Sequence, residues 1–386
     1  MLSTDILAAL TNKDILNQRF ATDLSEQTND ILSEMARWLR SKLSDTHSLF
    51  GEELTPAKVR RFNNLLSTIE DKLDEVYSTI NDLYMEQFRG LAIDDVDFVS
   101  QVINEELKEN FLMTKPGDAR LWSAVMDNPL HFPDDIKAPY VNFAQMVESL
   151  DINAKRVADT ISGGYYAGLT NQELVRQLIG TKKNNYQDGL VDISRRDANR
   201  IIRTSLTHVT SQARKRLYDD NKDIAFGYRI VATIDTRTSN ICKSLDGRVI
   251  KFTAPKSAQI LPPFHHNCRS ATVPEIYGRA LKDSGATRAV NFKARKGAEK
   301  GTVGQVDAQQ TYLDILRSQP LSQIELALGK VRAEIFKNAG LTTDEFRQAL
   351  ADNMGRPLTL AEMAKKNRKI LDYMKSRKDL EVYVDD

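Results

Sequence analysis

The chain has 386 residues, of which 41% are hydrophobic and 28% are charged. This composition is typical of a soluble globular protein, and the length is enough for two or three domains. The formal net charge is only +1, so no global field attracts nucleic acid or an anionic membrane. Any such contact must come from a local patch.

The N-terminal stretch, the lack of long apolar runs and the cysteines indicate in which compartment the protein is made. The N-terminal stretch MLSTDILAALTNKDILNQ has neither a basic region nor a long apolar run, so we expect no signal peptide. No window approaches about 20 consecutive apolar residues, so we expect no membrane-spanning helix and no membrane partner. The two cysteines, Cys242 and Cys268, predict no disulfide framework. We therefore expect synthesis in the cytosol.

The N-terminal part is dominated by one long heptad pattern. Thr55 and Pro56 are typical of a helix start. Apolar residues then recur in steps of three and four at Val59, Phe62, Leu66, Ile69, Leu73, Val76, Ile80 and Leu83. Such a seam packs against another helix. Residues 16–43, with a similar spacing, would supply it in an antiparallel hairpin through residues 44–54. The alternative is a seam shared with another protein chain.

Further helices are predicted over residues 96–111 and 140–161. Between them, residues 113–140 contain four prolines and many turn residues, so we predict an irregular loop there. His131 lies alone in this loop and is assigned no role.

Two helices with start signals follow near the middle of the chain. Thr170 and Glu173 have capping-box spacing before a helix that Gly180 would end. Ser194 and Asp197 predict the start of a second helix. A polar face of that helix carries Arg203, Thr207, Thr210 and Arg214 at steps of three and four.

A small antiparallel sheet is predicted next. The run GYRIVATID alternates like a strand, and a shorter run, RVIKF, follows Asp246 and Gly247. Asp-Gly is a strong signal for a tight hairpin turn. We expect these strands to pack on the preceding helices.

Several motifs in one order resemble the phage head morphogenesis family, whose members are phage Mu F-like minor head proteins. The order is GLTNQEL, ISRRDANRIIRT, IDTRTSNICKSLDGRVI and PPFHHNCRS, and the resemblance spans residues 161–363. The matching positions are Arg203, Thr204, Asp235, Arg237, Thr238, Asp246, Gly247 and Arg269, together with Cys242, His265 and Cys268. We interpret the first eight as a structural clasp.

The resemblance implies a virion structural protein and no enzyme. The expected role is that of a minor head protein in capsid assembly and head morphogenesis, associated with the portal in DNA packaging or delivery. Its expected partners are portal or capsid proteins, and its expected location is the virion head after synthesis in the host cytoplasm. We identify no catalytic residues.

The cysteines and His265 leave three interpretations open. Cys242, His265 and Cys268 have ligand types and spacing that suit zinc, although a fourth ligand is needed. Two further thiols found in many family members are replaced here by Ser239 and Ser270. Without a metal, the cysteines would pack as small hydrophobes in an apolar knot. The third interpretation is a disulfide between them.

An enzyme on the same module, a nuclease or a transferase-like protein, is the competing function. In such an enzyme, Cys242 would be the nucleophile, His265 the base and Asp235 the group that orients the base. We instead expect Asp235, Arg237 and Asp246 to form a buried network in which the arginine satisfies both carboxylates. On that hypothesis, replacing Arg237 with alanine lowers stability.

A basic stretch precedes the C-terminal part. Residues 281–310 lack periodicity and are interpreted as a flexible loop, either a solvated connector or a contact to packaged DNA. The candidate DNA contacts are Arg288, Lys293, Arg295, Lys296 and Lys300, which would make the protein a DNA-binding internal head protein.

The predicted fold is mainly α with a small α+β module. A long N-terminal helical hairpin or bundle occupies residues 1–160, and the α+β module with its small antiparallel sheet occupies residues 161–280. The basic loop covers residues 281–310, and a helical C-terminal region of short pieces covers residues 311–386.

Overall fold

The computed structural model describes residues 4–44, 55–107, 112–130, 132, 140–278, 287–293, 299–352 and 355–383. The helices before the first strand are α1 (Thr4–Ser44), α2 (Pro56–Leu107), α3 (Asp118–Asp127), α4 (Phe143–Glu148), η1 (Ser149–Asp151), α5 (Ile152–Tyr166), α6 (Asn171–Ile179), η2 (Lys182–Asn184) and α7 (Leu190–Asp220). The strands and the helices among them are β1 (Ala225–Val231), β2 (Ile234–Asp235), α8 (Asn240–Leu245), β3 (Val249–Lys251), η3 (Lys256–Ala258), β4 (Ala271–Ile276), β5 (Thr287–Asn291) and β6 (Val303–Asp307). The C-terminal helices are α9 (Tyr312–Arg317), α10 (Leu321–Leu328), α11 (Lys330–Asn338), α12 (Thr343–Leu350), α13 (Leu360–Lys366), α14 (Arg368–Lys375) and α15 (Lys378–Glu381).

The chain forms two compact units, and the predicted fold class is confirmed. The helical unit comprises Asn17–Gly90 and Val141–Leu206, and the mixed unit comprises Met1–Leu16, Leu91–Tyr140 and Thr207–Asp386. The helices α1, α2 and α7 each contribute residues to both units. The predicted boundaries at residues 160, 280 and 310 therefore do not coincide with these units. No helix among the described residues is long and apolar enough to cross a membrane.

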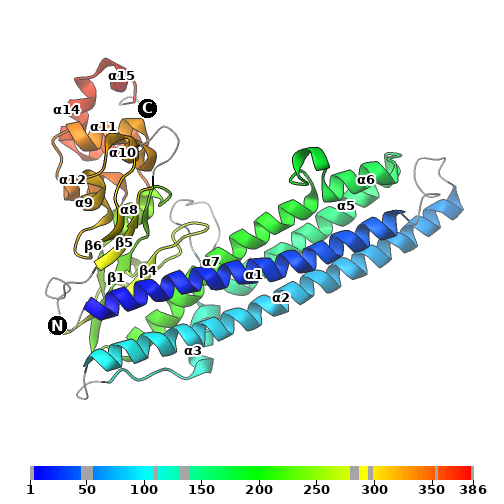
Figure 1. The fold of residues 1–386 in the computed structure, drawn as a ribbon, viewed down its shortest axis with the longest axis horizontal. Helices are drawn as coiled ribbons and strands as arrows, with labels where there is room; N and C mark the ends of the chain where they lie inside the picture. Colours follow the sequence, from blue (N-terminus) through cyan, green and yellow to red (C-terminus); the bar gives the residue numbers. More distant parts are fainter. Residues whose placement is uncertain are drawn as a thin grey trace. The chain divides into compact units, whose positions relative to one another are not determined.

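Five of the eight heptad-seam residues of α2 are buried within the helical unit: Phe62, Ile69, Leu73, Val76 and Ile80. Helix α1 runs side by side with α2 (Figure 1). The Thr28 hydroxyl of α1 lies 3.0 Å from the Tyr84 hydroxyl of α2, and the Phe20 and Phe88 rings meet edge to face with centroids 5.9 Å apart. On other sides, Phe62 stacks on Tyr165 of α5. α1 therefore contacts α2 through Tyr84 and Phe88, which follow the seam, and the seam residue Phe62 packs on α5.

Helix α6 confirms its predicted caps. The Thr170 side chain accepts from the Glu173 backbone N–H, the Glu173 side chain accepts from the Thr170 N–H, and Gly180 ends the helix at φ 91°. The predicted start of α7 at Ser194 is wrong, because that helix begins at Leu190. Ser194 is buried inside it, and its hydroxyl accepts from the Tyr77 hydroxyl at 3.1 Å.

Two predictions for the segments around α2 and α3 are also wrong. Residues 96–107 continue α2 and do not form a separate helix. The proline-rich stretch contains a helix, α3, whose Leu121 and Val125 are buried. The prediction missed α3 because its short apolar face, Leu121 and Val125, lies among prolines and turn-forming residues. His131 lies outside the described residues.

The mixed unit contains two three-stranded sheets, with orders β3-β1-β4 and β2-β5-β6. The first is antiparallel, as predicted, with Tyr228 opposite Ile250 in β3 and Pro274 in β4. In β1, Tyr228 and Ile230 are buried. Between them, Arg229 lies on the opposite face and pairs with Glu275 at 2.6 Å. This alternation is the period of two that the sequence shows.

The second sheet corrects the prediction of a flexible loop over residues 281–310. Strand β2 pairs in parallel with β5, and β5 pairs antiparallel with β6, with Val290 opposite Gly304. Val290 and Phe292 belong to a core cluster formed with the C-terminal helices α9 to α15, whose apolar faces are buried. The basic stretch is therefore the connection of a β-hairpin, and residues 294–298 of it lie outside the described part.

Candidate functional site

The clasp residues assemble into two carboxylate clusters, the first around Asp235 at the end of β2. Arg269 donates two hydrogen bonds to the Asp235 carboxylate, at 2.7 and 2.9 Å. The Thr238 hydroxyl and the Arg237 backbone N–H donate to the same group at 3.1 and 2.9 Å. Burial alone would raise the pKa of Asp235, but the Arg269 fork outweighs it and holds the pKa below its usual value. The carboxylate is therefore a fixed anion.

The second cluster surrounds Asp246, which is fully buried directly after α8. Arg288 forks onto its two oxygens at 2.8 and 2.9 Å. The backbone N–H groups of Ala232 and Tyr312 also donate to it, at 2.7 and 2.6 Å. Tyr312 begins α9, where a carboxylate is favourable. Asp246 therefore joins four segments that are distant in sequence.

Tyr312 connects the two clusters. Its backbone N–H donates to Asp246, and its hydroxyl donates to the backbone carbonyl of Asp235 at 2.7 Å. The ring is buried. No local pattern marked this tyrosine, because its two partners lie 66 and 77 residues away.

Gly247 follows Asp246 and needs the freedom of glycine. Its φ is +79°, and an added Cβ would lie 2.9 Å from the Thr311 methyl carbon. The predicted tight turn is present, but it joins α8 to β3 and is not a hairpin between two strands.

The predicted network around Arg237 is wrong. The Arg237 guanidinium lies 3.7 Å from Asp235, and its side chain is 69% exposed. Arg269 takes the position predicted for it, and Arg288 serves Asp246 separately. Two other predicted clasp residues have partners in the helical unit. Arg203 donates to Asn199 and to Gln18, and the Thr204 hydroxyl donates to the Arg200 carbonyl.

Cys242, His265 and Cys268 come together as the sequence suggested. Cys242 Sγ lies 3.2 Å from His265 Nε2 and 3.7 Å from Cys268 Sγ, and all three ligand atoms lie within 4.8 Å of one another. Both thiols are buried and free, so they are not joined as a disulfide. Burial would raise the pKa of the Cys268 thiol, but hydrogen bonds from Cys242 and His265 hold it well below its usual range. The cluster therefore favours one thiolate.

Local backbone features place these three side chains. Ser239 caps α8, its hydroxyl accepting from the Cys242 N–H at 3.4 Å. The turn from His265 to Cys268 closes with an N–H···O bond of 3.2 Å and has Asn267 at φ 57°, which asparagine tolerates. From α7, the Thr207 hydroxyl donates to the Cys268 carbonyl at 2.6 Å.

A buried arginine extends this framework toward the N-terminus. Arg214 is 1% exposed and donates to both Asp95 oxygens at 2.7 and 2.8 Å, to Asp14 at 2.7 Å, and to the Thr272 carbonyl at 3.2 Å. It thereby joins α7 to α1, α2 and β4. The polar face noted on the predicted helix is this buried face, because Thr207 and Thr210 are buried as well.

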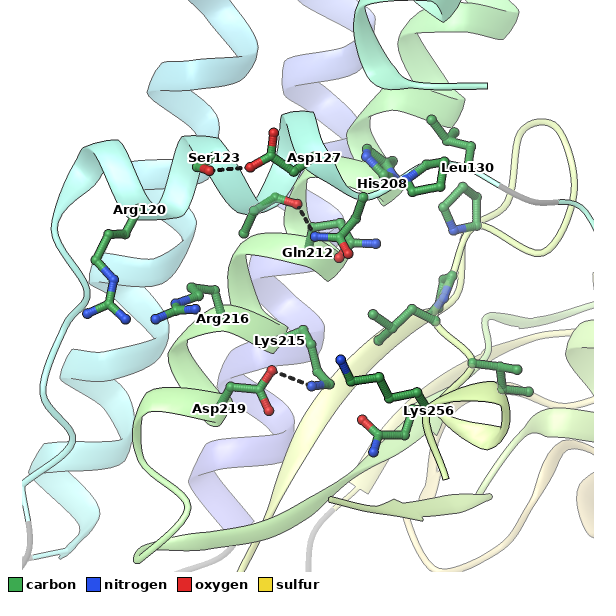
Figure 2. A pocket seen from close by; sticks show the side chains of 18 of the residues that line it. Arg120, Ser123, Asp127, Leu130, His208, Gln212, Lys215, Arg216, Asp219 and Lys256 are labelled. Carbon is green, nitrogen blue, oxygen red and sulfur yellow. Dashed lines mark hydrogen bonds and ion pairs between the residues drawn. The ribbon is translucent and has the colours of Figure 1, made fainter. Parts of the chain in front are cut away.

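A cavity of about 760 Å³ lies elsewhere in the mixed unit, lined by α3, α7 and residues 256–264 (Figure 2). Three of its four cationic side chains are bonded to carboxylates: Lys215 to Asp219, and both Arg120 and Arg216 to Asp220. Its histidine, His208, is also held, with Nε2 3.0 Å from the Val125 carbonyl oxygen. Burial lowers the pKa of His208 to about 4, so the ring is neutral at neutral pH.

The candidate DNA contacts separate into three groups. Arg288 is 5% exposed and is bonded to Asp246, so it is corrected to a clasp residue. Lys293 and Lys300 are exposed at the two ends of the β5–β6 connection. Arg295 and Lys296 lie outside the described residues.

The sequence of the module matches a known family. Residues 155–273 match the family model described as Phage Mu protein F like protein. This confirms the predicted resemblance, but only up to residue 273 of the 161–363 range. No curated protein and no solved structure matches the chain.

Proposed function

Since residues 155–273 of this chain match the phage Mu F-like family model, we propose that the protein is a minor head protein with a role in phage head morphogenesis. We place it in the virion head after synthesis in the host cytoplasm. Its proposed partners are the portal and capsid proteins, in capsid assembly and in DNA packaging or delivery.

The observation that carries this proposal is that arginine side chains hold both carboxylates of the family motif. Asp235 is held by Arg269 and Asp246 by Arg288, so the motif's carboxylates are used to fix the fold. The cavity beside Cys242 and His265 measures only about 30 Å³, which holds one or two waters. Both features support a structural module and argue against the nuclease or transferase-like alternative.

Deleting the gene from the phage that encodes it should yield defective heads, and supplying the protein in trans should restore them. Electron microscopy and the DNA content of purified particles measure this. Supply of the Arg237→Ala variant should restore heads fully, because that exposed side chain is not needed for the clasp. Normal DNA-filled heads after deletion would contradict the proposal. Failure of a folded Arg237→Ala protein would instead show that this exposed side chain acts outside the clasp, in assembly or in chemistry.

Packaged DNA is a second proposed partner, through the β5–β6 connection. Cations that contact phosphates release counterions, with a slope of log affinity against log salt of about −0.9 per contact. Replacing Lys293, Arg295, Lys296 and Lys300 with glutamine should make this slope shallower by up to about 4. Lys182→Gln with Lys183→Gln, a pair of exposed lysines in η2, is the control. An unchanged slope in the quadruple variant would remove DNA as a partner of this segment.

A further inference from the structure

The cluster of Cys242, His265 and Cys268 has the dimensions of a metal site. Two thiolates bound to one zinc at about 2.3 Å in tetrahedral geometry lie about 3.8 Å apart. The two sulfur atoms here are 3.7 Å apart and form no bond to each other. His265 Nε2 lies on the same side, 3.2 Å from Cys242 Sγ. A zinc ion therefore needs only small adjustments of these side chains.

The tautomer of His265 is fixed by its other nitrogen. Nδ1 lies 2.7 Å from the backbone carbonyl oxygen of His266, which can only accept, so Nδ1 carries the proton. Without a metal, Nε2 donates to the Cys268 thiolate, and once metal binding releases that proton Nε2 presents its lone pair to the ion. A backbone carbonyl that holds the second nitrogen of a histidine is the usual support of a metal-binding imidazole.

The space beside the cluster accounts for the fourth ligand position. The cavity of about 30 Å³ is bordered by the three ligands and by Thr238, Ser239 and Ser270. It accommodates a water molecule. Ser270 is 4% exposed, and its hydroxyl lies at this cavity beside the Cys242 thiol. A zinc-bound water in the cavity would give that hydroxyl a further partner.

We propose that Cys242, His265 and Cys268 bind one Zn²⁺ ion, with water as the fourth ligand, and that the ion fastens α8 to the 265–268 turn. Two thiolates and a neutral imidazole balance the charge of Zn²⁺, so the buried site is neutral overall. The role is structural, since the adjoining cavity is too small for a substrate. The assignment does not depend on the proposed function.

The test is zinc content and cobalt spectroscopy on the full-length protein, reconstituted under reducing conditions. The wild type should retain one zinc per chain after removal of free metal, and Co²⁺ should give thiolate charge-transfer absorption with tetrahedral d–d bands. Cys268→Ser and His265→Asn should lose both. The matched control is His266→Asn, which should retain both, because the His266 ring packs at a tilt against Phe132 and only its backbone supports His265.

Two measurements on folded protein keep the test decisive if a cysteine variant fails to fold. Zinc should raise the thermal unfolding temperature of the wild type, and a strong chelator should lower it. Ser270→Cys should release zinc to a competing chelator more slowly, because it offers a third thiol at the cavity. A wild type without zinc, without charge-transfer absorption and without a chelator effect would overturn the proposal. A Cys242–Cys268 disulfide found by mass spectrometry would overturn it as well.

Discussion

Replacing Arg214 with methionine should lower the free energy of unfolding of the mixed unit by about 3–5 kcal/mol. The reason is that Asp95, which is fully buried, would lose both of its hydrogen bonds from the guanidinium. Methionine fills a similar volume, so most of the loss comes from the stranded carboxylates. Removing one partner of a buried ion pair leaves an uncompensated charge in a medium of low dielectric constant.

The two tryptophans allow the loss of stability to be measured in the mixed unit alone. The chain has two, Trp38 in the helical unit and Trp122 in the mixed unit. Denaturant unfolding followed by Trp122 fluorescence, in a Trp38→Phe background, reports on the mixed unit. Arg216→Met is the matched control on the same helix, with an expected effect under about 1 kcal/mol because its pair with Asp220 is partly exposed. Equal effects of the two variants would contradict the assigned role of Arg214.

Asp14 provides a pH test of the same cluster. Burial, only partly offset by Arg214, raises the pKa of Asp14 from 3.8 to about 6. The folded state therefore binds this proton more tightly than the unfolded state. Its contribution to stability is fully present below about pH 4 and is lost as the pH rises through about 6; it amounts to at most about 3 kcal/mol, because the side chain is 28% exposed. Asp14→Asn, which resembles the protonated form, should remove this decline and be at least as stable as the wild type at pH 7.

Asp246→Asn should also cost about 3–5 kcal/mol, because Arg288 would be left as a buried cation without its carboxylate. The amide keeps the size of the side chain, but its NH₂ group would face donors on Arg288 and on the Ala232 and Tyr312 backbones. The same Trp122 readout applies. Arg237→Ala is the control, with an effect below about 1 kcal/mol. A larger effect from Arg237→Ala than from Asp246→Asn would restore the network first predicted from the sequence.

The sequence predicted the elements that local patterns determine. The α2 seam, the caps of α6 and the alternation of β1 all follow from spacing, and the structure has them. Ser194 shows the limit of such signals. Its capping-box spacing is genuine, but burial against Tyr77 places it inside a helix, because tertiary packing outweighs a cap.

The sequence predicted most residues of the site, but not which arginine pairs with which carboxylate. Cys242, His265 and Cys268 were found because thiols and imidazoles are rare and their spacing is informative. The arginines could not be assigned, because Arg237, Arg269 and Arg288 are chemically alike and only the fold decides which is buried. Arg288 was grouped with a basic run by composition, although its carboxylate is 42 residues away.

Cryo-electron microscopy of purified wild-type heads tests directly whether this protein is a component of the phage head. We expect density for the mixed unit of this chain in the head, in contact with the portal or the capsid shell, with the Asp246–Arg288 pair inside the module. Complete, DNA-filled heads that contain no copy of this chain, by density and by mass spectrometry of the same particles, would contradict it.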